Sequence, residues 1–167
     1  MAKLQRVVPC LWFDTEAEEA ATFYTSIFDN ARIVRVTRFA EAGQEIHGRP
    51  AGSVMAVVFT LDGQEFMALN GGPQFKFTEA VSFQVFCETQ EEIDYYWSRL
   101  TADGGQEGPC GWLKDRFGLS WQVVPRAMEE EWLVDPDPAR VQRVLEVLYT
   151  MEGKLEIEPL RRAYYGE

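Results

Sequence analysis

The chain has 167 residues, of which 46% are hydrophobic and 26% are charged, as in a globular protein that can bury a core. Its net charge of −11 disfavours nucleic acids and anionic membrane surfaces as partners. We find no apolar run of about 20 residues and no signal-peptide pattern, so we expect a cytoplasmic protein that does not enter a membrane. The three cysteines are widely spaced and odd in number, which favours neither a disulfide framework nor a zinc ribbon.

The first part of the chain predicts a module in the order strand, helix, strand, strand, strand. An apolar run over 4–13 predicts the first strand. Thr15 and Glu18 have the spacing of a capping box, with Thr15 capping a helix over 16–28. The remaining strands are expected over 31–39, 54–61 and 64–70, with a glycine-rich loop over 40–53 and an Asp-Gly hairpin turn at 62–63.

Residues 80–126 repeat this order. A strand over 81–87 is followed by a second capping box, Thr89 with Glu92, and by a helix over 90–101. A short segment over 106–109 and two strands within 110–125 complete the repeat. We therefore predict an α+β fold with two βαβββ modules, over 4–73 and 80–126, that form one domain as a pseudo-dimer. The alternative is a chance likeness between two capped helices.

Alternation of side chains along a strand predicts which residues share a face. In the strand over 31–39, Arg32 and Arg35 fall on opposite faces. After the turn at 115–118, one face of the last strand carries Leu119, Trp121 and Val123, and the other carries Ser120, Gln122 and Val124. If the apolar face packs on helices, the face with Gln122 borders a cavity.

Residues 127–167 predict a C-terminal helical extension. Asp137 and Pro138 are typical of an N-cap and first helical position, and apolar residues recur at helical spacing over 139–151. A shorter helix is expected after Pro159. The apolar face of this helix must be buried, either on its own domain or on a partner chain. We expect a homodimer.

Three stretches, residues 9–28, 66–100 and 110–125, resemble the PhnB-like branch of the vicinal oxygen chelate superfamily. This branch also carries the name 3-demethylubiquinone-9 3-methyltransferase. The superfamily includes glyoxalase I, bleomycin-resistance proteins and extradiol dioxygenases. The resemblance extends into the tail and implies a glyoxalase/bleomycin-resistance-like paired half-barrel, in which two βαβββ modules curl around a cavity.

The resemblance also implies a position for a divalent metal, which the metal enzymes of the superfamily hold with histidine and glutamate. Matching strand positions places Pro9 and Ser82 where the histidines would stand, and Gln122 where one glutamate would stand. The other glutamate position falls on Phe66, Ala68 or Asn70. Neutral amide and hydroxyl oxygens are poor ligands for such ions, so we expect no metal and no cofactor.

The methyltransferase name finds no support in the sequence. An S-adenosylmethionine site of the usual kind has a glycine-rich turn between a strand and a helix. The glycine-rich segment 104–108 instead follows a helix and precedes a strand.

Polar and aromatic side chains are expected to line the cavity, namely Ser82, Gln84, Ser120, Gln122, Asn70, Phe66 and Trp112. They would suit an uncharged or zwitterionic small molecule, which would satisfy the buried polar groups. The alternative is that Gln84 and Gln122 bond to each other across the sheet.

Three residues are candidates for catalysis: Cys110, His47 and Glu41. His47 has the ordinary pKa of an acid–base group and, with Glu41 and Glu45, could also form a metal site in the loop. Cys110 is a candidate nucleophile, whereas Cys87 is expected in the core.

The leading hypothesis is a metal-independent protein that binds an unidentified small molecule. The alternative is an enzyme with an atypical metal site or with cysteine, histidine or glutamate chemistry, and a third hypothesis is an interaction protein.

Overall fold

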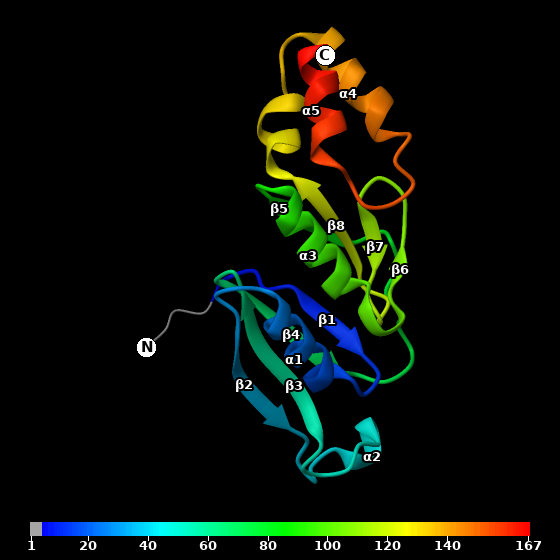
Figure 1. Ribbon diagram of the computed structural model, residues 1–167. Coiled ribbons are helices and arrows are strands. Elements are labelled where there is room, and N and C mark those ends of the chain that lie inside the picture. Colours follow the sequence, from blue (N-terminus) through cyan, green and yellow to red (C-terminus); the bar gives the residue numbers. More distant parts are fainter. Residues whose placement is uncertain (1–4) are drawn as a thin grey trace. The chain divides into compact units, whose positions relative to one another are not determined.

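The computed structural model describes residues 5–167 and divides the chain into two compact units, Met1–Lys76 and Phe77–Glu167 (Figure 1). The start of the first expected strand, at residue 4, lies outside the described residues. Each unit has the predicted order βαβββ, so the α+β fold with two modules is confirmed. None of the helices found in residues 5–167 is both long enough and apolar enough to span a membrane.

The first unit contains one mixed sheet in the order β1-β4-β3-β2. Its elements are β1 (Cys10–Phe13), α1 (Ala17–Ile27), β2 (Arg32–Arg38), α2 (Gln44–His47), β3 (Val54–Leu61) and β4 (Gln64–Asn70). β1 runs parallel to β4, and the other neighbours are antiparallel. The short helix α2 interrupts the expected loop over 40–53. Helix α1 covers one face of the sheet, where Tyr24 stacks on Phe59 and Phe59 stacks on Phe66.

The second unit repeats this sheet in the order β5-β8-β7-β6. Its elements are β5 (Ser82–Cys87), α3 (Gln90–Leu100), the 3-10 turn η1 (Ala102–Gly104), β6 (Gln106–Glu107), β7 (Trp112–Lys114) and β8 (Ser120–Pro125). β5 runs parallel to β8, and the pairs β8–β7 and β7–β6 are antiparallel. The C-terminal residues follow as the π-helical segment η2 (Met128–Trp132), α4 (Pro138–Leu148) and α5 (Ile157–Tyr165).

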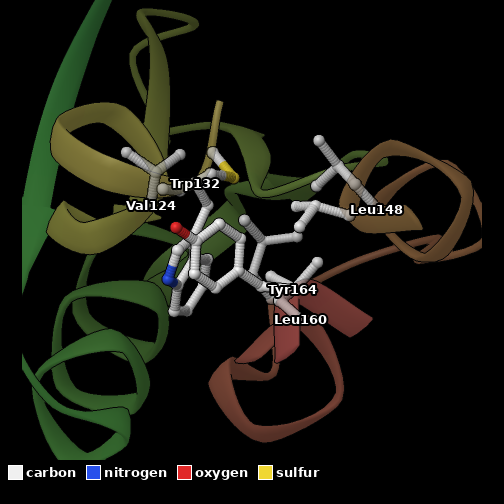
Figure 2. Packing of buried hydrophobic residues seen from close by; sticks show 8 residues of the cluster. Val124, Trp132, Leu148, Leu160 and Tyr164 are labelled. Atoms are coloured by element: carbon white, nitrogen blue, oxygen red, sulfur yellow. The ribbon is translucent and has the colours of Figure 1, made fainter. Parts of the chain in front are cut away.

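The C-terminal extension packs on the second unit through its own hydrophobic cluster. Figure 2 shows Trp132 and Leu148 gathered with Val124 of β8, and Leu160 and Tyr164 of α5 complete the labelled set. The apolar stripe is therefore at least partly buried on the chain's own second unit, which is one of the two outcomes expected. As predicted, the Asp137 side chain caps α4 by accepting a hydrogen bond from the N–H of Ala139.

A side-chain amide at the start of α3 also fastens the extension. Gln90 donates to the carbonyl of Leu155 at 3.0 Å and accepts from the N–H of Ile157 at 2.8 Å. This pair of bonds reproduces the donor and acceptor pattern of a neighbouring strand. Residues after 126 thus belong to the same compact unit as the second module.

The two predicted capping boxes have different outcomes. Thr89 accepts from the N–H of Glu92 at 3.2 Å, which confirms its role as the cap, whereas Glu92 accepts from the N–H of Glu88 and not from that of Thr89. In the first module Thr15 does not cap the helix, so that prediction is wrong. Asn70 takes this role from the end of β4, because its Oδ1 accepts from the N–H of Ala17 at 2.8 Å. Its Nδ2 donates to the carbonyl of Val54 at 3.0 Å.

Replacing Asn70 with alanine should therefore destabilise the first unit by about 1–3 kcal/mol, because a buried N–H and a carbonyl lose their partner. Thr15→Ala is the matched control and should change the free energy of unfolding by less than about 0.5 kcal/mol. Urea unfolding of both variants measures the difference. Equal losses in the two variants would show that Thr15, and not Asn70, supplies the cap.

Candidate ligand-binding site

A single buried carboxylate organises the turn between β7 and β8. Asp115 is 2% exposed, and its Oδ1 accepts from the N–H groups of Phe117 and Leu119 at 2.8 and 3.1 Å. Its Oδ2 accepts from Nε1 of Trp121 at 2.9 Å. Gly118 completes the turn with φ +85°, a conformation that glycine adopts at low cost. Because Trp121 is tied back to the turn, it points to the face that packs on α3, and its neighbours Ser120 and Gln122 point to the other face.

The register of the sheet then gathers polar side chains on the face opposite α3, as predicted for β8. Residues paired across neighbouring strands share a face, and Ser120 pairs with Ser82 and with Lys114. Gln122 pairs with Gln84 and with Trp112. We call this surface the open face of the second sheet. It brings together five of the predicted cavity residues, namely Ser82, Gln84, Trp112, Ser120 and Gln122.

Gln122 is bonded to a neighbour on this open face. Its Nε2 donates to Oγ of Ser82 at 2.8 Å, so the expected alternative of a Gln84–Gln122 bond is not observed among the described residues. Gln84 is exposed, and Ser82 and Gln122 are half-buried. The arrangement leaves the carbonyl oxygen of Gln122 as an acceptor for a ligand.

A pocket of about 420 Å³ adjoins these residues at β6, β7 and the start of β8. Its lining consists of Glu79, Gln106, Glu107, Gly108, Pro109, Trp112, Leu113, Lys114 and Ser120, and we call it the Ser120 pocket. Ser120 is 1% exposed, and its Oγ has no hydrogen-bond partner among the described residues. A buried hydroxyl without a partner is costly, so this atom calls for a bound molecule or an ordered water.

An ion pair lies beside the pocket. Nζ of Lys114 contacts the carboxylate of Glu79, and both residues line the pocket. The hydrogen bond from Lys114, together with its charge, lowers the pKa of Glu79 from its ordinary value. The pair is therefore intact at neutral pH and is lost as the pH falls through this lowered pKa. Opposite charges side by side can each contact one end of a zwitterion.

Two predicted cavity residues lie elsewhere. Phe66 and Asn70 point to the face of β4 that α1 covers, where Phe66 stacks on Phe59 and Asn70 caps α1. The prediction that these two side chains line the cavity is therefore wrong, because it assigned them to the opposite face of β4. The sequence of β4 alternates too weakly to show this, because both of its faces carry apolar residues.

The three catalytic candidates are not brought together in a way that supports catalysis. The thiol of Cys110 donates to the carbonyl of Leu148, inside the contact with the C-terminal extension. His47 stacks on Phe39, and its Nδ1 accepts from the N–H of Arg49 at 3.0 Å. Glu41 is exposed at the start of the same loop. A catalytic role for any of them stays a prediction.

Cys87 lies in the core, as expected. It is 1% exposed, and burial is the main cause that raises the pKa of its thiol to about 12. A thiol in this state is a poor nucleophile at neutral pH.

The residues at the positions of the superfamily's metal ligands do not fit a divalent ion. Ser82 and Gln122 bond to each other, and Phe66 and Asn70 face α1. Over residues 5–167, the structure contains no group of three histidine, cysteine, aspartate or glutamate side chains arranged to hold a metal ion. Glu41, Glu45 and His47 thus do not form the loop site that their spacing suggested.

Comparison with known families identifies the chain. The family model described as 3-demethylubiquinone-9 3-methyltransferase matches residues 5–124. The chain belongs to this family. Residues 125–167, which include the C-terminal extension, lie beyond the matched range of this family. A comparison with curated proteins gives no match.

Solved structures agree with this assignment. A PhnB protein from Bacillus cereus, which carries the same methyltransferase description, is 39% identical with a TM-score of 0.63 and covers 72% of this chain and 99% of its own. Protein PA1353 from Pseudomonas aeruginosa is 22% identical with a TM-score of 0.56, covering 74% and 98%. The fosfomycin resistance protein FosX from Listeria monocytogenes is 16% identical with a TM-score of 0.50, covering 78% and 98%. The last two show a shared fold alone.

We expect Asp115→Asn to destabilise the second unit by about 2 kcal/mol or more. Both carboxylate oxygens of Asp115 accept from N–H groups, and in the variant the amide nitrogen of asparagine would place a donor opposite one of these N–H donors. Asp103→Asn is the matched control. The carboxylate of Asp103 is exposed, and its ion-pair partner Arg116 lies 3.8 Å away. Chemical unfolding followed by tryptophan fluorescence measures both. A loss in Asp115→Asn no larger than in the control would contradict the role given to this carboxylate.

Proposed function

We propose that this family member binds an uncharged or zwitterionic small molecule at the Ser120 pocket without a metal ion. The observation that carries the proposal is the hydroxyl of Ser120, which is buried, lines a pocket of about 420 Å³ and lacks a partner among the described residues. Its Oγ atom is covered in this structure, so a ligand reaches it once the groups that cover it shift, and the hydroxyl can then donate one hydrogen bond and accept others.

The chemistry of the surrounding residues supports this class of ligand. Trp112 offers an aromatic surface, and Gln106 offers an amide that can both donate and accept. Lys114 and Glu79 neutralise each other, and the remaining carboxylate of the lining, Glu107, accepts a hydrogen bond from Nε1 of Trp97. Sites for small molecules typically combine apolar walls with a few polar groups that fix orientation.

A thermal-shift screen of uncharged and zwitterionic metabolites and antibiotics should find a compound that raises the melting temperature, because binding to the native state stabilises it. Ser120→Ala should weaken binding of that compound at least about fivefold, the equivalent of one hydrogen bond. The free variant should be at least as stable as the wild type, because it no longer buries an unpartnered hydroxyl.

Ser98→Ala is the control for this experiment, since Ser98 lies exposed on α3. It should leave the affinity unchanged. Unchanged affinity in Ser120→Ala, or a marked loss of stability in the free variant, would contradict the proposal.

The enzyme alternative with an atypical metal site differs most clearly in its requirement for metal. If binding is metal-independent, the purified protein titrated with Zn²⁺, Mn²⁺ and Ni²⁺ against a competing chelator should retain less than about 0.1 equivalent, because its neutral oxygen ligands are weak. A stoichiometric ion that is lost in Gln122→Ala and kept in Gln142→Ala would favour the enzyme. Gln142 is a suitable control because it is exposed on α4. The homodimer and the cytoplasmic location expected from the sequence stay predictions.

A further inference from the structure

The edge strand β2 departs from the alternation that its sequence predicts. Arg32 pairs with Thr60 and Arg35 pairs with Val58, but the register shifts between Ile33 and Arg35. Thr60 and Val58 lie on the face of β3 opposite Phe59, which stacks under α1. The shift is a β-bulge that inserts one extra residue, so Arg32 and Arg35 share the face not covered by α1. Their predicted placement on opposite faces is therefore wrong.

The two arginines have no intramolecular partner in residues 5–167. Neither takes part in an ion pair or a side-chain hydrogen bond there, and both are exposed. The chain as a whole has a net charge of −11. Two guanidinium groups on one face of the same strand, without a partner in the described residues, are therefore a local source of positive charge on an acidic protein, and they attract carboxylates of another molecule.

The backbone of β2 is also available. β2 is the outermost strand of its sheet, and no backbone hydrogen bond reaches its outer edge from the described part of the chain (Figure 1). With Arg32–Arg38 it has seven residues, more than the other edge strands β1, β5 and β6. Ile33 and Val34 are 38% and 47% exposed beside the arginines. The edge thus offers backbone groups, positive charge and apolar surface together.

We propose that β2 is a docking site for an acidic extended segment of a partner protein. The segment adds to the sheet as a further strand, with its carboxylates over Arg32 and Arg35 and apolar residues near Ile33 and Val34. This mode of recognition takes affinity from main-chain hydrogen bonds and specificity from alternate side chains. It is independent of the ligand proposed for the Ser120 pocket.

Other occupants fit these features less well. In a two-fold antiparallel pairing with a second copy of β2, the arginines of one strand would face those of the other, and like charges opposite each other are destabilising. A nucleic acid carries a phosphate on every nucleotide, so the net charge of −11 would repel it more strongly than a short segment with a few carboxylates. The arginines and the bulge could also serve only to protect the edge from aggregation, and that reading predicts no binding at all.

The test uses a fluorescein-labelled peptide in which glutamate alternates with valine and threonine, titrated with the full chain. We expect binding that weakens at least about tenfold in the double variant Arg32→Glu/Arg35→Glu, because two charge-assisted contacts become repulsive. Arg99→Glu/Arg162→Glu is the control with the same change in net charge, at two exposed arginines of the second unit. It should change the affinity by less than about twofold. If the glutamate variant fails to fold, Arg32→Gln/Arg35→Gln replaces it.

Several results would overturn the proposal. A peptide with N-methyl groups along one edge should lose binding, and equal binding would exclude strand addition. Equal binding of a lysine-for-glutamate peptide would exclude charge recognition, and tighter binding of a single-stranded oligonucleotide would identify a nucleic-acid site. Self-association that is lost in the glutamate variant, without peptide binding, would assign the edge to a second copy. If none of the probes binds, the proposal is wrong, and the arginines and the bulge of β2 serve only to protect the edge from aggregation.

Discussion

The candidate site depends on the hydrogen bonds of one buried carboxylate. Asp115 holds two backbone N–H groups of the β7–β8 turn and the indole of Trp121. By fixing Trp121 on the helix-covered face, these bonds decide that Ser120 and Gln122 lie on the open face. A strand repeats every two residues, so a slip by one residue would exchange the two sets of side chains. The chemistry of the site thus follows from the geometry of its turn.

The two modules share an order of elements but differ in what they expose. In the first, Asn70 ends β4 by capping α1, and both its amide oxygen and its amide nitrogen are hydrogen-bonded inside the unit. In the second, Ser120 has no partner in the described residues, and the extension packs against Val124 at the end of the same strand. This asymmetry favours the second unit as the place where a small molecule binds. The first unit instead presents a basic strand edge.

The sequence predicts the fold well because its local signals are strong. The Asp-Gly hairpin, the Thr89 cap and the turn at 115–118 each act through neighbouring residues, and the structure contains all of them. The failures have a tertiary origin. Asn70 displaces Thr15 as a cap from 53 residues away, and the bulge in β2 reverses the parity of Arg35. The missing partner of Ser120 cannot be predicted from sequence, because it depends on everything that packs around the hydroxyl.

We propose that a ligand in the Ser120 pocket supplies the missing hydrogen-bond partner of Ser120. A crystal structure of the full chain, grown with a compound that raises its melting temperature, tests this most directly. We expect density for that compound in the pocket beside Trp112 and Lys114, within hydrogen-bonding distance of Oγ of Ser120. The proposal would be contradicted by a Ser120 hydroxyl bonded to another group of the protein in a pocket filled by side chains, or by the compound bound elsewhere.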